Sequence, residues 1–82
     1  MLTPEQEEAL TGIFREVLKL PDLVLRDDLT AKEVPGWDSF NNINLIIHTE
    51  DQYGIRFKAE EVVNLRNVGE MKCIISKKIS EK

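Results

Sequence analysis

An all-α fold, a bundle of four helices, is what this sequence predicts. Three stretches place apolar residues at the three- and four-residue spacing of an amphipathic helix. No stretch alternates apolar and polar residues as a half-buried strand does. The 82 residues, 41% of them hydrophobic, leave room for one domain, residues 1–82, and a domain of this size buries only about 60% of its unfolded surface. We therefore expect a marginally stable bundle with a long first loop and a short third helix.

The first helix is predicted from about Pro4 to about Lys19. Thr3 is a good N-cap residue, Pro4 fits the first helical position and Gln6 stands at the capping-box position. Five apolar residues then fall on one helical face: Leu10, Ile13, Phe14, Val17 and Leu18.

Residues 20–37 are predicted to form a long loop that is held down by its own side chains. The segment contains two prolines and a glycine, but too many apolar residues for a free linker. The residues expected to pin it across the bundle are Leu23, Val24, Leu25, Leu29 and Val34.

The second helix is predicted to begin at about Phe40, with Asp38 or Ser39 as its N-cap, and to end at Tyr53 before Gly54. Leu45 is placed away from the centre of its buried face. The residues assigned to that face are Phe40, Ile43, Ile46 and Ile47.

Two further helices complete the bundle. Glu60 to Leu65 suffices for a short third helix, and Asn67-Val68-Gly69-Glu70 has the spacing of a capping box that opens the fourth. Cys73 lies beside the inner face of this helix and is expected in the core, because free cysteines are among the most buried residues. The inner face is Val68, Met71, Ile74, Ile75 and Ile79.

Charge and composition exclude several functions. The net charge of −4 and the absence of Lys and Arg from residues 38–53 disfavour binding to nucleic acid, including a DNA-binding helix-turn-helix. No apolar run has the length of a membrane span, and the N-terminus lacks the layout of a signal peptide. Cys73 is the only cysteine, which suits a reducing compartment. A soluble cytoplasmic protein is expected.

Ser39 is the candidate functional residue. It follows an aspartate in Gly36-Trp37-Asp38-Ser39-Phe40, at a junction between a turn and a helix. A helix N-terminus carries a partial positive charge, so it would stabilise a phosphate on the Ser39 oxygen. In most proteins a serine at this place is only an N-cap, and that simpler interpretation is the alternative.

The same residues, taken in order along nearly the whole chain, resemble the family of acyl carrier and peptidyl carrier proteins. The family signature is Asp-Ser-Leu, whose serine bears phosphopantetheine, and here it reads Asp38-Ser39-Phe40. The upstream Asp28-Leu29, the downstream Gly54-Ile55 and the order of the helices extend the match. We therefore prefer the carrier interpretation to the N-cap alone, with a bundle of the acyl-carrier-protein type.

The resemblance implies a non-catalytic carrier. A phosphopantetheinyl transferase would attach phosphopantetheine from coenzyme A to Ser39, and its thiol would hold an acyl or aminoacyl group for acyl-activating, acyltransferase or condensing enzymes in trans. Ser39 is not expected to be a catalytic nucleophile, because the lone His48 lies about two and a half turns along the same helix. Met1 and the immediate start of the first helix indicate a free-standing protein, which we expect to be a monomer.

Four residues around Ser39 are candidates for partner recognition: Trp37, Asp38, Phe40 and Ile43. Asp38 is expected both to cap the helix and to be read by the transferase. Phe40 fits a docking surface and the core equally well, whereas for Trp37 packing is favoured over docking.

The second helix departs from the family in its charge. Carriers of fatty-acid synthesis often have an acidic second helix, but here only Glu50 and Asp51, near its end, are acidic. Weaker electrostatic steering is expected, with more dependence on amide hydrogen bonds and apolar shape. This favours a specialised lipid, polyketide or related pathway. The remaining alternative is an unmodified helical module that binds a protein partner through the same helix.

No metal site is predicted. His48 stands without a second histidine or cysteine nearby, so a solvated or half-buried side chain is expected. Four carboxylates lack the spacing of a calcium loop and are expected on a solvated face: Asp27, Asp28, Glu60 and Glu61.

Overall fold

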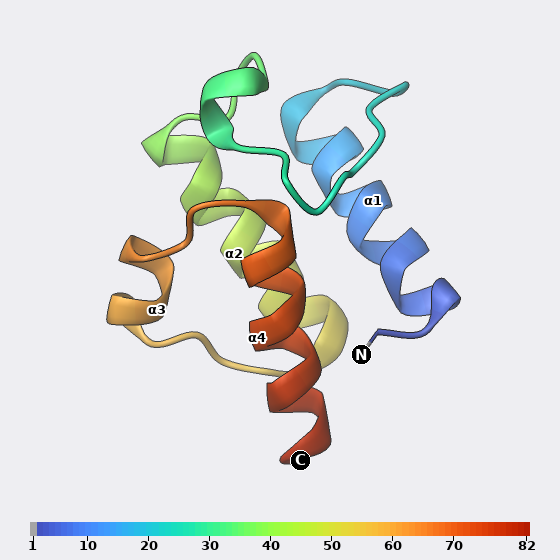
Figure 1. Ribbon diagram of the computed structural model, residues 1–82, viewed down its shortest axis with the longest axis vertical. Coiled ribbons are helices and arrows are strands. Elements are labelled where there is room, and N and C mark those ends of the chain that lie inside the picture. The colour runs from blue at the N-terminus through green and yellow to red at the C-terminus, as the bar shows by residue number, and fades with distance from the viewer. Residues whose placement is uncertain (1) are drawn as a thin grey trace.

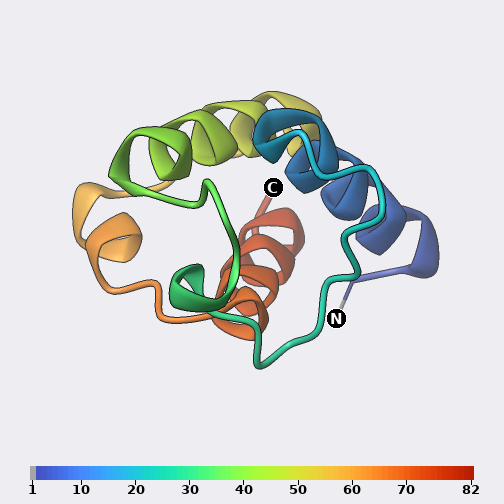
Figure 2. The ribbon, with the colours of Figure 1, turned by 90° about the horizontal axis from the view of Figure 1, so that it is seen from above.

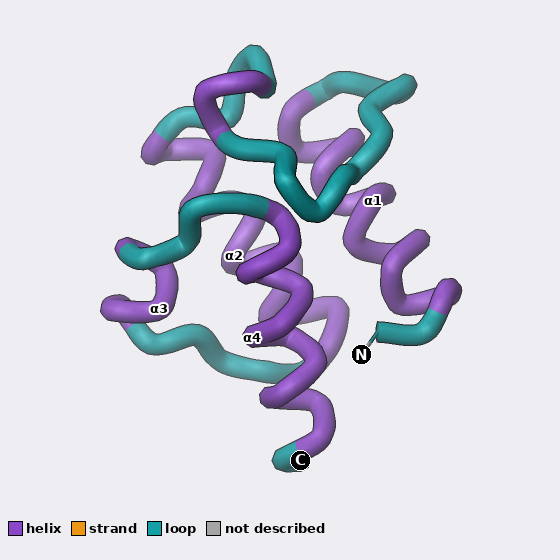
Figure 3. The backbone as a smooth tube through the Cα atoms, in the orientation of Figure 1, coloured by secondary structure: helices purple, strands orange, loops and turns teal. Residues whose placement is uncertain are grey.

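The computed structural model describes residues 2–82, and all regular structure in that range is helical (Figures 1 and 3). A short 3₁₀ helix, η1, interrupts the long loop and was not predicted. Seen from above, α1 and α2 lie beside each other on one side of the bundle, α4 lies on the other, and α3 lies at the edge (Figure 2). The prediction of an all-α bundle is confirmed. The elements are α1 (Pro4–Leu18), η1 (Ala31–Glu33), α2 (Ser39–Tyr53), α3 (Ala59–Val63) and α4 (Val68–Ser80).

Helix α1 begins and ends as its sequence predicts. Thr3 Oγ1 accepts a hydrogen bond from the Gln6 backbone N–H at 3.1 Å, and Gln6 Oε1 accepts one from the Thr3 N–H at 2.9 Å. This reciprocal pair satisfies two amide groups that a helix start leaves free. At the other end, Lys19 adopts a left-handed conformation with φ 57° as the C-cap.

The hydrophobic core is drawn from α1, α2, α4 and the connecting segments, whereas η1 and α3 contribute no buried residue. Ile13 and Val17 pack against it from the margin of the α1 face, as predicted. The residues that form the core are Leu2, Leu10, Phe14, Leu18, Leu29, Val34, Leu45, Ile46, Tyr53, Ile55, Val68, Met71 and Ile75.

The buried face predicted for α2 is largely wrong. Ile46 is buried, but Phe40, Ile43 and Ile47 are 74%, 56% and 55% exposed, while Leu45 is buried at the centre of the core. The helix has two apolar faces, and the one with more isoleucine residues points outward. Periodicity finds both faces but does not decide which of them the other helices cover.

The buried face of α2 includes two hydroxyl groups. Thr49 is fully buried, and its hydroxyl donates to the Leu45 carbonyl oxygen at 2.7 Å. The Tyr53 hydroxyl donates to the Gln6 carbonyl oxygen of α1. Because both hydroxyls are satisfied, their burial carries little penalty. Gly54 ends the helix as predicted, with φ 64°.

The long loop caps α4 with its backbone. The carbonyl oxygens of Asp27 and Leu29 accept hydrogen bonds from the N–H groups of Gly69 at 2.8 Å and Val68 at 3.0 Å. A Cβ at residue 69 would lie 2.9 Å from the Asp27 oxygen, so this close approach requires glycine. The loop is thus fixed to α4 at the end of the bundle where α2 also begins (Figure 1).

The apolar residues of the loop behave mostly as predicted. Leu29 and Val34 are buried in the core, and Leu23 and Leu25 pack against it. Val24 is the exception, because its side chain is 68% exposed.

Helix α4 starts at the predicted place with a modified cap. Asn67 Oδ1 accepts from the Glu70 N–H at 2.9 Å, but the Glu70 carboxylate accepts from the Arg66 N–H at 2.8 Å rather than from Asn67. Val68, Met71 and Ile75 are buried, Ile79 packs against the core, and Ile74 is half-buried.

The prediction that Cys73 lies in the core is wrong, because the side chain is exposed. Cys73 is two residues from both Met71 and Ile75, which are buried. Two residues correspond to about 200° around a helix, so the thiol points away from the face that both neighbours share.

Helix α3 spans Ala59–Val63, shorter than predicted, and is attached to α4 by polar contacts as well as apolar ones. Lys78 Nζ lies 3.0 Å from Glu61 Oε1 and 6.0 Å from the centre of the Phe57 ring. Val62 packs against the core from the same helix. The Lys58 backbone N–H, at 2.7 Å, and then the Lys78 ammonium lower the pKa of Glu61 below its ordinary value of 4.5.

Replacing Phe14 by alanine is expected to remove about 3–5 kcal/mol of unfolding free energy, because the side chain is fully buried. Total stability is only about 0.05–0.15 kcal/mol per residue, so this loss is a large share of the free energy of unfolding. Urea unfolding followed by circular dichroism measures the loss. Val24→Ala, at an exposed site, is the control and should change stability by less than about 0.5 kcal/mol; equal losses in both variants would contradict the assigned core.

The Glu61→Gln variant should lose less stability on acidification than the wild-type protein. A carboxylate with a lowered folded-state pKa contributes stability that is present above its unfolded pKa and is lost as the pH falls through the lowered value. Urea unfolding at about pH 7 and about pH 3 measures this difference. Glu60→Gln, an exposed acid on the same helix, should behave like the wild-type protein. Identical acid sensitivity of Glu61→Gln and the wild-type protein would show that the contacts of Glu61 contribute nothing.

Candidate functional site

Ser39 occupies the first position of α2, and its side chain is exposed. Asp38 is the N-cap: its Oδ1 accepts from the Asn41 N–H at 2.8 Å, which settles the choice left open between Asp38 and Ser39. Among the described residues no hydrogen bond to the Ser39 hydroxyl is found. The hydroxyl is therefore accessible and is not used as a cap.

Two asparagines tie the turn before Ser39 to the helix after it. Asn41 Nδ2 donates to the Gly36 carbonyl oxygen at 2.6 Å, and Asn42 Oδ1 accepts from Trp37 Nε1 at 3.1 Å. Gly36 has φ 85°, a conformation that favours glycine. The role of both amides was not predicted, although an asparagine one turn after a Gly-Trp turn is a usable signal.

Trp37 packs as predicted. Its ring meets that of Phe14 edge-on, with the centroids 5.1 Å apart and the planes at 88°. The indole is half-buried, and Trp37 directly precedes the Asp38 cap. The contact with Phe14 therefore links the core to the start of α2. A role for Trp37 in partner recognition stays a prediction.

A cavity of about 490 Å³ adjoins Ser39 between α2 and the α3 region. Its wall combines apolar side chains from both sides with Arg66 and the Asp38 carboxylate. The α3 side of this cavity was not predicted, because contacts between distant segments leave no local pattern in the sequence. The lining residues are Ala31, Trp37, Asp38, Ser39, Asn42, Ile43, Val62, Val63, Leu65 and Arg66.

The lining of this cavity contains few groups that could act on the Ser39 hydroxyl. Of the described residues, no histidine, lysine or cysteine contributes to the wall, and the Asp38 carboxylate in it accepts the Asn41 N–H as the cap of α2. His48 is exposed, which confirms the expectation of a solvated side chain. The exposed Ser39 hydroxyl can accept a covalently attached group.

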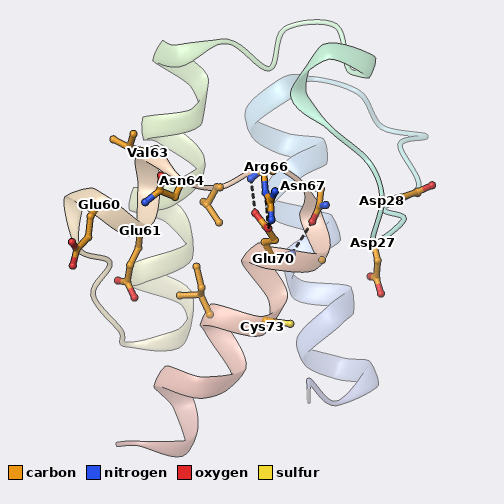
Figure 4. A pocket seen from close by; sticks show the side chains of 13 residues that line it. Asp27, Asp28, Glu60, Glu61, Val63, Asn64, Arg66, Asn67, Glu70 and Cys73 are labelled. Atoms are coloured by element: carbon orange, nitrogen blue, oxygen red, sulfur yellow. Dashed lines mark hydrogen bonds and ion pairs between the residues drawn. The ribbon is translucent and has the colours of Figure 1, made fainter.

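A larger pocket of about 1170 Å³ lies between α3, α4 and the long loop, and Ser39 does not line it (Figure 4). Arg66 and Glu70 face each other across 2.7 Å, with Asp27 and Asp28 on the loop side and Glu60 and Glu61 on the α3 side.

The acidic residues around this pocket do not form a metal site. Asp27 pairs with Lys72 at 3.0 Å, Asp28 with Arg26 at 3.3 Å and Glu61 with Lys78 at 3.0 Å. Within residues 2–82 no group of three or more His, Cys, Asp or Glu side chains is placed to hold a metal ion. Among the same residues no helix is long and apolar enough to cross a membrane.

Among known proteins, this chain is similar in sequence to acyl carrier proteins. No family model matches the chain. It is 29% identical to an acyl carrier protein of Acidothermus cellulolyticus over 79% of this chain and 81% of that protein. It is 28% identical to the meromycolate extension acyl carrier protein of Mycobacterium tuberculosis over 88% of this chain, but spans only 65% of that protein's length.

A solved structure extends the comparison to the fold. The holo acyl carrier protein of Geobacter metallireducens superimposes with a TM-score of 0.86 at 35% identity, covering 96% of this chain and 90% of that one. Agreement in sequence and in fold over almost the whole length, together with the exposed serine at the start of α2, shows that the chain belongs to the acyl carrier protein family.

Proposed function

We propose that Ser39 is the attachment site of the phosphopantetheine through which an acyl carrier protein carries acyl groups as thioesters. The observation that supports this most directly is the exposed Ser39 hydroxyl at the first position of α2, directly after the Asp38 cap. A phosphopantetheinyl transferase would join the Ser39 oxygen to phosphopantetheine taken from coenzyme A. Once bound, the group supplies a thiol on a long flexible arm.

The chain's own residues fit this role. The partial positive charge at the start of a fifteen-residue helix favours a phosphodiester at Ser39. Asp38 uses its carboxylate to satisfy the Asn41 N–H, which leaves the serine hydroxyl free. Ile43, Val62 and Leu65 give the adjoining cavity apolar walls, which suit the start of a hydrophobic chain.

We also propose a cargo, partner enzymes and a cellular location for this carrier. The relatives are named acyl carrier proteins, which favours an acyl over an aminoacyl cargo, and the mycobacterial ones are named for meromycolate extension. We infer a carrier for a specialised lipid pathway, formed by residues 1–82 as one monomeric domain. It would serve acyl-activating, acyltransferase or condensing enzymes in trans. The single cysteine fits work in the reducing cytoplasm.

Ser39→Ala should fold normally and lose all loading. The change removes one exposed hydroxyl that is not the cap, so the expected cost to stability is below about 0.5 kcal/mol. The measurement is the intact mass after incubation with coenzyme A, magnesium and a broad-specificity phosphopantetheinyl transferase. The wild-type protein should gain one phosphopantetheinyl group and the variant none.

Two other outcomes would contradict this assignment. Loading that persists in Ser39→Ala would move the site to another serine, such as Ser80. A folded wild-type protein that gains no mass would favour the unmodified interaction module.

The two roles of Asp38 can be separated by comparing Asp38→Asn with Asp38→Ala. Asparagine keeps an N-cap oxygen without the charge, so stability should stay close to that of the wild-type protein, whereas alanine should cost about 1 kcal/mol. If the transferase reads the charge, loading should slow in both variants. Thermal unfolding and loading rate are measured on the same samples. Wild-type loading by Asp38→Asn would show that the residue is only a cap.

A further inference from the structure

The cavity beside Ser39 has two charged residues in its wall. Among the described residues that line it, Arg66 is the only cation and Asp38 the only anion. Asp38 and Ser39 lie at the start of α2, whereas Arg66 lies in the link between α3 and α4 (Figure 4). A group attached to Ser39 would therefore share its cavity with an arginine from a distant part of the chain.

A phosphodiester on Ser39 would be repelled by its own neighbour. Asp38 is an anion in the same cavity wall, and like charges in one site disfavour each other. The start of α2 supplies only a partial positive charge, and its Asn41 N–H already bonds Asp38 Oδ1 at 2.8 Å. Residues 38–53 contain no lysine or arginine. A permanent positive charge beside Ser39 can therefore come only from another element.

The guanidinium of Arg66 has donors left for a further partner. Its side chain is 83% exposed, and its Nε and Nη2 donate to Glu70 Oε2 at 2.9 Å and 2.7 Å. Among the described residues no hydrogen bond from Nη1 is found. Because a guanidinium presents five N–H donors in a planar fork, Arg66 can bond a second anion while it keeps Glu70.

The ion pair with Glu70 also leaves Arg66 free to turn. Exposed ion pairs contribute little to stability. The Glu70 side chain is 31% exposed, and its Oε1 accepts the Arg66 backbone N–H at 2.8 Å. The carboxylate therefore stays hydrogen-bonded and hydrated if the guanidinium moves away. Arg66 can bridge two anions or exchange one for the other at little cost.

Other basic residues are less well placed. Among the described residues no other lysine or arginine lines the cavity. Lys32 follows the lining residue Ala31 in η1, but its exposed side chain is not part of the wall. Lys78 lies 3.0 Å from Glu61 of α3 and is not part of the wall either. Arg66 is thus the cation that shares a site with the Ser39 oxygen.

We propose that Arg66 is a positioning residue for the phosphopantetheine arm: its guanidinium donates hydrogen bonds to the phosphodiester on Ser39 and offsets the repulsion from Asp38. This inference rests on the proposed function, because it takes Ser39 as the attachment site. An arginine suits the role, since its planar fork matches the oxygens of a phosphate and charge-assisted hydrogen bonds are the strong ones. The contact would tie the root of the arm to the side of the cavity that contains Leu65.

A thermodynamic cycle tests this contact through folding stability. Unloaded and loaded forms of the wild-type protein and of Arg66→Gln, each confirmed by intact mass, are unfolded in urea. Loading should stabilise the wild-type protein more than the variant, by about twofold to fivefold in the unfolding equilibrium constant, as for exposed ion pairs. Two controls should behave like the wild-type protein: Arg56→Gln, at another exposed arginine that pairs with a glutamate, and Lys32→Gln, at a nearby cation outside the wall.

Nuclear magnetic resonance tests the contact at the two groups themselves. When the wild-type protein is loaded, the Nε–H signal of Arg66 should shift, whereas that of Arg56 should not. In the loaded protein, the phosphorus signal of the phosphodiester should shift when Arg66→Gln replaces the wild-type residue. In Arg66→Lys, which keeps the charge without the planar fork, the phosphorus signal should lie between these two positions.

Each contrary result has a distinct meaning. Wild-type protein that is not loaded at all would overturn the proposed function and this inference with it. Wild-type protein that loads without a shift of the Arg66 Nε–H signal would overturn only the role of Arg66, and this readout needs no variant to fold or load. Equal coupling for Arg66→Gln and Lys32→Gln in the cycle would show a general effect of charge and refute the contact.

Discussion

The edge-to-face contact between Trp37 and Phe14 fixes the position of the candidate site on the bundle. Phe14 is fully buried, so the indole that packs on it is held against the core. Its Nε1–H donates to Asn42 in the first turns of α2, and Asp38, the next residue along the chain, caps that helix. Ser39 can therefore be exposed and still precisely located relative to the core, because the residues on both sides of it are anchored.

The long loop also fixes the end of the bundle where α2 begins, through its contacts with α4. Its backbone carbonyls at Asp27 and Leu29 complete the start of α4, and Gly69 permits this close approach. The next part of the loop buries Val34 and then leads to Trp37. One segment thus satisfies the first turn of α4 and sets the first turn of α2, which explains why a domain of this size has so long a connection.

Local chemistry in the sequence predicted where the helices begin and end, but not which faces meet. Thr3 and Gly54 act at the predicted boundaries because caps depend only on neighbouring residues. Ile43 was assigned to the buried face as well as to partner recognition, and Cys73 was expected in the core, but both are exposed because burial depends on how helices are arranged in space. Ser39 was found because its signature is local. The cavity beside it, with its α3 wall, depends on contacts between distant segments.

The inner and outer faces of α2 differ in an unexpected way. The inner face contains Thr49 and Tyr53, whose hydroxyls are satisfied by backbone oxygens, while the outer face presents Ile43 and Ile47 to water. Folding alone gives no reason for this, since exposed isoleucines contribute little to stability and increase the risk of aggregation. Phe40, directly after Ser39, is also exposed. Such an arrangement is expected if that face is covered by another protein during part of the working cycle.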